Sequence, residues 1–148
     1  MDVMTDPELV AAVADGDVGA LRELHRRHAP WLAARLGYRC ADPGTVEEAV
    51  QDAFVAVWRG ARYRGDGEVG AWLWGIAIHK LVDRLRRHPA PRLVTPAVVE
   101  SAEEAVLAGI GYGELGPAMA QLSPELMAVV QARILDGLNT REAAQLLG

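Results

Sequence analysis

One stretch of the sequence combines cations with large apolar side chains in a pattern that can bind a nucleic-acid strand. Residues 71–87 read AWLWGIAIHKLVDRLRR, and a helix over them would bury one broad face. The predicted buried face holds Leu73, Trp74, Ala77, Ile78, Leu81, Val82 and Leu85. The opposite face holds Trp72, Ile76, His79, Lys80, Asp83, Arg86 and Arg87. Cations there can contact phosphates, and apolar side chains can contact unstacked bases.

Each outward side chain suits one part of an unpaired strand. Trp72 and Ile76 offer apolar contact for bases, whereas the ring of His79 has a donor and an acceptor that can read a base edge. Tyr63 and Arg64 precede the helix in a loop and can frame a pocket for one flipped base. The cations that can contact phosphates are Lys80, Arg84, Arg86 and Arg87.

Simpler interpretations stand beside this one. Trp72 can pack as ordinary core, either on the loop that holds Tyr63 or on the first helix. Arg86 and Arg87 can be solvated cations that favour the helix dipole. His28 lies on the buried stripe of an earlier helix, which indicates a structural histidine rather than a ligand.

Charge is distributed in blocks along the chain. Residues 42–58 contain four acids and no base, whereas residues 59–88 contain seven bases and three acids. After His88 there are three bases and seven acids. A basic block beside an acidic block predicts two different partners for one small domain. The net charge of −5 argues against a protein that coats DNA by itself.

The composition predicts a helical protein, and its single cysteine predicts a reducing compartment. The chain has 148 residues, of which 51% are hydrophobic, mostly Ala, Leu and Val, and this mixture favours helices over a sheet. The single Cys40 excludes a disulfide framework. The first residues lack a signal-peptide pattern, and no apolar run approaches the roughly 18 residues of a membrane span. We therefore expect a cytoplasmic protein without membrane contact.

Helix start signals divide the first 88 residues into a bundle of three or four helices. Asp6 with Pro7 predicts one start, Asp17 the next, and Thr45 the third, since a glutamate follows Thr45 at capping-box spacing. A loop rich in Gly and Arg at residues 60–67 then leads into the long helix. No strand-like alternation occurs, so we expect an all-α fold.

A second helical unit follows a linker rich in proline and glycine. This unit is predicted to start near Pro117, and residues 101–108 could form a short helix within the linker. Ser123 begins a helix that stops at Gly137, and Asn139 begins another. Two short helices joined by a glycine-containing turn resemble the front half of a helix-turn-helix.

An enzyme is the rival class, and its usual motifs are missing. Di-metal helical bundles use a Glu with a His three residues later, but none of the four histidines has a Glu at that position. HExxH, P-loop and CxxC motifs do not occur. We expect no catalytic residue, metal or cofactor. A helical adaptor that binds only protein remains the second alternative.

Four segments in order resemble one family. DPELVAAVADGDVGALRELHRRHAP resembles the opening helices of the extracytoplasmic-function sigma factors, and TVEEAVQDAFVAVWRGARYRG resembles their polymerase-binding helix and the following loop. AWLWGIAIHKLVDRLRR is similar to the segment that melts and reads the minus-10 element. LSPELMAVVQARILDGLNTREAAQLLG resembles the start of the domain that reads the minus-35 element.

This resemblance implies a promoter-recognition subunit of bacterial RNA polymerase. It implies sigma region 2 over residues 1–88, a linker over 89–116 and a partial region 4 over 117–148. The implied partners are the clamp coiled coil of core polymerase, the minus-10 non-template strand and an anti-sigma factor. The implied polymerase-binding face consists of Glu48, Gln51, Asp52, Val55 and Trp58.

The sequence departs from the family pattern at three places. It ends at Gly148, before the recognition helix, so the resemblance implies no base readout upstream by these residues and poor duplex binding by the free chain. Gly75 stands where members often carry a bulky or basic residue, and His79 where Asn is common. These two changes bear on the promoter sequence rather than on the role.

Overall fold

The computed structural model describes residues 3–65, 67–88 and 123–147, and the regular elements in these ranges are all helical. They are α1 (Asp6–Ala14), α2 (Val18–Gly37), α3 (Pro43–Trp58), α4 (Val69–Arg87), α7 (Pro124–Val130), the π-helix η1 (Gln131–Leu135) and α8 (Thr140–Leu147). The predicted all-α fold is therefore confirmed. The predictions for a linker at 89–116, a short helix at 101–108 and a start near Pro117 lie outside the described residues.

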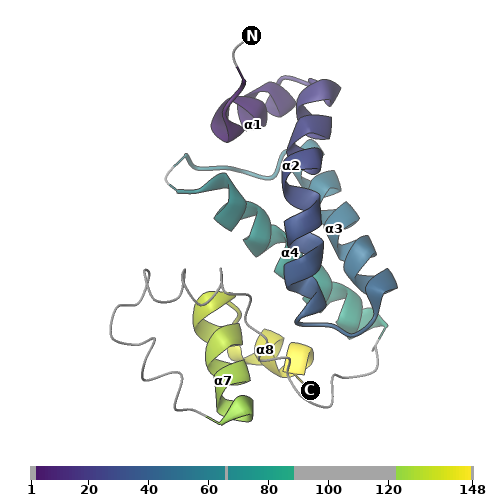
Figure 1. Cartoon of the computed structure of the whole chain (residues 1–148), viewed down its shortest axis with the longest axis vertical. Coiled ribbons are helices and arrows are strands. Elements are labelled where there is room, and N and C mark those ends of the chain that lie inside the picture. Colours follow the sequence, from purple (N-terminus) through teal and green to yellow (C-terminus); the bar gives the residue numbers. More distant parts are fainter. Residues whose placement is uncertain (1–2, 66, 89–122, 148) are drawn as a thin grey trace.

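Helices α1 to α4 form what we call the N-terminal bundle. In Figure 1, α2 and α3 lie side by side, α4 runs obliquely across them, and α1 packs near the first turns of α2. We call residues 123–147 the C-terminal unit. It lies at the other end of the bundle, where α8 packs against α4. Helix α4 therefore contacts α2, α3 and α8.

The inner face of α4 is buried as its periodicity predicts. Leu73, Ile78 and Leu81 have no exposed surface, and all seven residues predicted for this face are buried. They share one core with Leu24 and Leu32 of α2. Burying a side chain of this size contributes roughly 1.5–3 kcal/mol, so this face supplies much of the stability of the bundle.

The start of α1 differs from the prediction by one residue. Thr5, rather than Asp6, is the N-cap: its hydroxyl accepts a hydrogen bond from the Glu8 amide at 3.4 Å. The Glu8 carboxylate in turn accepts from the Thr5 amide at 2.8 Å, which completes a capping box. Asp6 instead lies inside the helix, where its carboxylate contacts Arg27 and His28 of α2.

The N-cap of α3 lies three residues before the predicted Thr45. The helix begins at Pro43, since proline lacks an N–H and its φ suits the first helical position. The N-cap is Asp42, whose carboxylate accepts from the Gly44 amide at 3.3 Å and from the Thr45 hydroxyl at 2.7 Å. The Thr45 hydrogen bond is the main reason that the pKa of Asp42 is lowered. Thr45 therefore supports the cap from inside the first turn.

The predicted starts of α2, α7 and α8 are confirmed. Asp17 accepts from the Ala20 amide at 3.1 Å, and Ser123 accepts from the Leu126 amide at 3.3 Å. Before α8, Asn139 and Glu142 form a reciprocal capping box. Helix α4 begins at Val69, two residues before the predicted Ala71.

The helix that precedes Gly137 ends in a π-helical turn, which is wider than an α-helical turn and was not predicted from the sequence. Residues 131–135 form the π-helix η1, and the Asp136 amide donates to the Gln131 carbonyl at 2.9 Å. Gly137 has a φ of 68°, the left-handed conformation that glycine adopts without strain at a helix end. This turn leaves Asp136 buried against the N-terminal bundle.

His28 has the structural role that its position predicts. Its Nδ1 accepts from the Trp31 indole at 2.8 Å, so the proton lies on Nε2, which is 2.8 Å from the Asp6 carboxylate. A Cβ on Gly70 would lie 3.4 Å from the Trp31 ring, so α2 and α4 approach closely here. This network joins α1, α2 and the start of α4.

The N-cap of α2 gives a test of this fold. We expect Asp17→Ala to lower the free energy of unfolding by about 1 kcal/mol, because the Ala20 amide loses its acceptor. Asp17→Asn keeps an acceptor and should retain most of the stability. Urea unfolding measures both. The control is Asp15→Ala at the exposed end of α1; an equal loss in Asp15→Ala and Asp17→Ala would contradict the cap.

Candidate nucleic-acid interface

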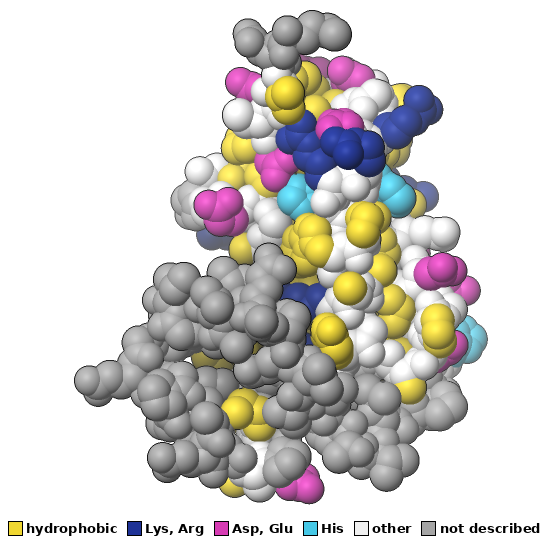
Figure 2. All heavy atoms as spheres, in the orientation of Figure 1, with side chains coloured by type: hydrophobic (Ala, Val, Ile, Leu, Met, Phe, Trp, Pro, Cys, Tyr) yellow, Lys and Arg dark blue, Asp and Glu magenta, His cyan; other side chains and the backbone are white. Residues whose placement is uncertain are grey.

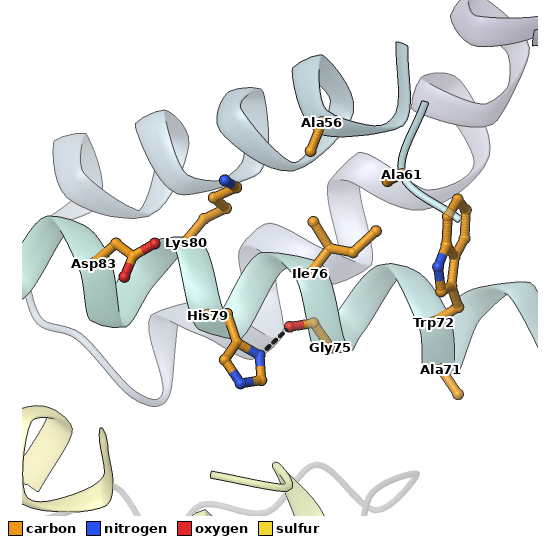
Figure 3. A pocket seen from close by; sticks show the side chains of 9 residues that line it. All are labelled: Ala56, Ala61, Ala71, Trp72, Gly75, Ile76, His79, Lys80 and Asp83. Atoms are coloured by element: carbon orange, nitrogen blue, oxygen red, sulfur yellow. Dashed lines mark hydrogen bonds between the residues drawn. The ribbon is translucent and has the colours of Figure 1, made fainter. Parts of the chain in front are cut away.

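Four of the residues predicted to face a strand line one groove beside α4. Trp72, Ile76, His79 and Lys80 surround a hollow of about 540 Å³. Figure 3 shows the groove, with α3 along one side of it. The other lining residues are Ala56, Ala61, Ala71, Gly75 and Asp83. The groove thus brings apolar surface, a ring that can form hydrogen bonds and one ammonium group together on one helix face.

Gly75 keeps the centre of this groove open. A Cβ added at this position would meet no atom within 4 Å, so the space beside it is unfilled. Glycine in the middle of a helix costs about 1 kcal/mol relative to alanine. The backbone carbonyl of Gly75 also has a partner in the groove, the Nδ1 of His79 at 2.6 Å (Figure 3).

His79 uses both ring nitrogens in this structure. Nδ1 faces the Gly75 carbonyl, which only accepts, so this nitrogen carries a proton. Nε2 lies 3.2 Å from a carboxylate oxygen of Glu142 in α8, and the two form an ion pair only when this nitrogen is protonated as well. The ring can therefore read a base edge only after it gives up one of these partners.

Trp72 packs on the preceding loop, as the simpler interpretation of this residue expects. Its indole nitrogen donates to the Arg62 carbonyl at 3.1 Å, and its ring lies 5.2 Å from the Tyr63 ring at an angle of 51°. Tyr63 is itself tied to the loop by a hydrogen bond to the Gly67 carbonyl. Trp72 is half-buried and still lines the groove, so a packed ring wall borders the groove at this end.

The predicted phosphate-binding cations differ in their partners. Lys80 makes no hydrogen bond or ion pair with the described residues, and Arg64 is exposed in its loop. Arg86 pairs with the Asp83 carboxylate, whereas Arg87 donates to the Asp83 backbone carbonyl at 3.4 Å. Lys80 is therefore the cation of the groove that is most available to a phosphate.

Arg84 is engaged between two helices. Its Nε and Nη2 donate to the two carboxylate oxygens of Asp52 at 2.6 and 3.0 Å, and its Nη1 donates to Glu48 at 2.7 Å. The Arg84 hydrogen bonds are the main reason that the pKa of Asp52 is lowered. Three of the five N–H groups of Arg84 are in use and two carboxylates match its charge, so Arg84 is less available to a phosphate than an unpaired cation. This pairing was not predicted from the sequence. A signal for it exists, because Glu48 and Asp52 lie one helical turn apart and a basic helix follows them.

The face predicted to bind polymerase is consequently divided. Asp52 is half-buried and Glu48 is exposed, but both are held by Arg84. Gln51, Val55 and Trp58 are exposed along α3, with Val55 at 46% and Trp58 at 42% of full exposure. Exposed Val and Trp on one helix face form an apolar surface that suits a protein partner.

A buried contact between the bundle and the C-terminal unit was also absent from the prediction. The Asp136 carboxylate accepts from Arg39 Nε at 3.0 Å and from the Trp74 indole at 3.2 Å. Arg39 and Asp136 lie 97 positions apart, so no local pattern links them. The ion pair of Arg39 and Asp136 thus covers part of the Trp74 side chain.

Arg26 and Arg27 of α2 are paired with neighbouring acids. Figure 2 shows blue and magenta side chains together near α1. There Glu23 pairs with Arg26 and Arg27, and Arg27 also reaches Asp6. Hydrogen bonds from Arg26 and then Arg27 lower the pKa of Glu23 to about 2. This paired cluster offers less to a phosphate than the Lys80 groove.

The described part of the chain contains neither a candidate metal cluster nor a membrane-spanning helix. Within residues 3–65, 67–88 and 123–147, no group of three His, Cys, Asp or Glu side chains could hold a metal ion. None of the helices in the same ranges is long and apolar enough to cross a membrane. Burial raises the pKa of the Cys40 thiol, which makes it a weaker nucleophile.

Comparison with known proteins gives the family. The family model for Sigma-70 region 2 matches residues 24–89. The ECF RNA polymerase sigma factor SigM of Mycobacterium tuberculosis is 35% identical over 150 residues, which cover 97% of this chain and 74% of the relative. The chain belongs to the ECF sigma factors. Its function is that of a sigma factor in transcription initiation, and it is not an enzyme.

More distant ECF sigma factors agree. BldN of Streptomyces coelicolor is 27% identical over 151 residues, covering 95% of this chain and 57% of the relative. SigL of Mycobacterium tuberculosis is 26% identical over 153 residues, covering 94% and 82%. No solved structure matches the chain significantly. As a sigma factor, the protein binds core RNA polymerase and promoter DNA.

The Arg84 bridge gives a test by stability. We expect Arg84→Ala to lower the free energy of unfolding at pH 7 by about 1 kcal/mol, since Asp52 and Glu48 lose their partner. Asp52 has a lowered pKa in the folded sigma factor, so its contribution is present above the unfolded value near 4 and lost as the pH falls below it. The variant should therefore lose less stability on acidification.

Chemical unfolding between pH 7 and pH 3 measures this difference. Arg86→Ala is the matched control, because Arg86 is more exposed and pairs only within α4. Equal acid sensitivity of Arg84→Ala and the unsubstituted chain would contradict the bridge.

Proposed function

We propose that residues 1–88 act as sigma region 2 and that residues 117–148 act as part of region 4. Residues 89–116 would be the linker between them. The N-terminal bundle supports the first assignment, because α3 and α4 present two different surfaces on one compact core. The match of the region 2 family model to residues 24–89 supports the same boundary.

The outer face of α4 is the proposed surface for the minus-10 non-template strand. Trp72 and Ile76 would contact bases, Lys80 would contact a phosphate, and His79 would read a base edge. The observation that carries this proposal is the groove, because these four side chains line it together and the space beside Gly75 is open. Tyr63, Arg64, Arg86 and Arg87 remain proposed contacts at its ends. Arg84 has a smaller proposed part, because its donors are held by Asp52 and Glu48.

The exposed face of α3 is the proposed surface for the clamp coiled coil. Gln51, Val55 and Trp58 would make the central contacts, because these side chains are exposed on one face. Glu48 and Asp52 would border that surface while Arg84 holds their carboxylates. Charge reversal at Asp52 would break the bridge to α4, so it tests folding together with binding.

Two further parts of the proposal rest on the sigma role. The protein would act in the cytoplasm, where core polymerase transcribes. An anti-sigma factor would be a third partner that holds the two helical units. Transcription by core polymerase with and without this chain, on promoters with varied minus-10 sequences, tests the function as a whole.

The polymerase surface gives a direct test. We expect Val55→Asp to weaken binding to core polymerase by about tenfold, because it places a charge in an apolar contact. Fluorescence titration of labelled protein with core polymerase measures this. The control is Val18→Asp, the same change at an exposed position of α2. If both variants bind core polymerase equally well, the surface lies elsewhere.

The groove gives a second test, with different outcomes for different side chains. Lys80→Ala should weaken promoter binding by the polymerase complex and lower the salt dependence by about one released counterion. His79→Ala should change the preference among minus-10 sequences more than the overall affinity. Trp72→Ala should impair duplex opening more than closed-complex formation, because stacking needs an unstacked base.

Promoter binding measured over a salt series, with permanganate footprinting for the open region, separates these effects. Arg22→Ala removes an exposed cation from α2 and is the control for general charge. A salt dependence that falls equally in Arg22→Ala and Lys80→Ala would argue against a specific phosphate contact.

A further inference from the structure

Gly75 lies in the middle of α4, where nothing in the described part of the chain requires a glycine. A glycine inside a helix is less favourable than alanine, because it loses more conformational freedom on folding. Two features of a fold can require one, a positive φ or a close neighbour. Gly75 is not among the glycines with a positive φ, and a Cβ added to it would meet no atom within 4 Å. Alanine would therefore fit at this position and favour the helix.

The other glycine of α4 shows the contrast. A Cβ on Gly70 would lie 3.4 Å from the Trp31 ring, so the packing of α2 on α4 accounts for that glycine. The space beside Gly75 instead opens into the groove of α4. Glycine is also used where a ligand approaches the backbone closely. The explanation that remains for Gly75 is a contact with a molecule outside this chain.

The neighbours of Gly75 on the helix surface form a slot for a flat ring. Residues four positions apart are neighbours on one helix face, and here these are Ala71 and His79, both of them exposed. They lie about 12 Å apart along the axis, and only the hydrogen of Gly75 stands between them. Figure 3 shows the three residues along α4, with Trp72 beside them. The Gly75 carbonyl holds His79 Nδ1 at 2.6 Å, which fixes the ring at one end of the slot.

The charges around this slot suit a nucleotide. Figure 3 shows the Lys80 side chain pointing toward α3, and Lys80 makes no hydrogen bond or ion pair with the described residues. Arg64 is exposed in the loop before α4. Asp83 is the one acid that lines the groove, and Arg86 pairs with it. A base over Gly75 would thus have cations available for the phosphates on either side of it.

We propose that Gly75 is a specificity-determining residue, which lets an unpaired purine of the melted strand lie flat on the backbone of α4 between Ala71 and His79. This inference rests on the proposed role of the α4 face in DNA binding and names the class of base that this face takes. A purine fills a slot two helical turns long better than a pyrimidine, because its second ring buries more apolar surface. A side chain at position 75 would occupy the space of that second ring.

The first experiment measures base preference with a randomised single-stranded oligonucleotide pool and the complex of the full chain with core polymerase. Sequencing of the bound fraction should reveal one position at which purines are preferred about tenfold. Gly75→Leu should abolish this preference and leave the other positions as they are, because the leucine fills the slot. A purine preference that is retained in Gly75→Leu, or absent from the unsubstituted chain, would overturn the proposal.

The matched control is Gly37→Leu. Gly37 is an exposed helical glycine at the end of α2, and a Cβ added there also meets no atom within 4 Å. This variant should keep the purine preference of the unsubstituted chain. Equal loss in Gly37→Leu and Gly75→Leu would assign the effect to a general disturbance of the bundle and overturn the role of the slot.

A smaller substitution keeps the test valid if Gly75→Leu disturbs folding. Gly75→Ala should raise the melting temperature of the free chain, because alanine favours the helix. The same variant should lower the purine preference by about threefold, since its methyl group enters the slot. Its affinity for core polymerase should not change, because the proposed polymerase surface lies on α3. A stabilised Gly75→Ala with an unchanged purine preference would mean that no ligand uses the open space.

Two variants in the same assay test the proposed DNA surface separately. If Trp72→Ala and Lys80→Ala both bind the pool like the unsubstituted chain, the DNA surface lies elsewhere and the purine slot falls with it. If they weaken binding while Gly75→Leu keeps the purine preference, the DNA surface stands and only the role of Gly75 is overturned.

Discussion

Burial of the inner face of α4 is the constraint on which the rest of the structure depends. Helices α2, α3 and α8 all pack against this helix, and Leu73, Ile78 and Leu81 in it have no exposed surface. Once that face is covered, the period of 3.6 residues directs Trp72, Ile76 and His79 outward. The surface that we assign to DNA is therefore positioned by the apolar core beneath it.

The two charged blocks of the sequence meet at Arg84. This residue belongs by sequence to the basic block, but its hydrogen bonds go to Asp52 and Glu48 of the acidic block. The proposed polymerase surface on α3 and the proposed DNA surface on α4 are thus joined by a charged bridge as well as by the core. Charge counts along a chain describe what each segment carries, whereas the fold decides which charges remain available.

Local signals predicted most of the fold, and long-range contacts decided the rest. Periodicity identified the buried face of α4, and side-chain caps such as Asp17 and Ser123 marked the helix starts. The starts of α1 and α3 were misplaced because several residues that can cap a helix stand close together. At α3, Pro43 favours the first helical position, which makes the preceding Asp42 the cap. The site residues on α4 were recognisable by type. The pairing of Asp136 with Arg39 was not, because no sequence period connects positions so far apart.

The open space beside Gly75 belongs to the proposed DNA surface and not to the packed core of the bundle. A side chain at this position would enter open space rather than the core, because no atom lies within 4 Å of the point that its Cβ would occupy. The core of α4 therefore places no demand on the size of residue 75. A larger side chain at residue 75 would therefore change the shape of the groove and leave the packing of α4 as it is. If the groove binds DNA as proposed, its selectivity can change by one surface substitution, without any change in the scaffold that carries it.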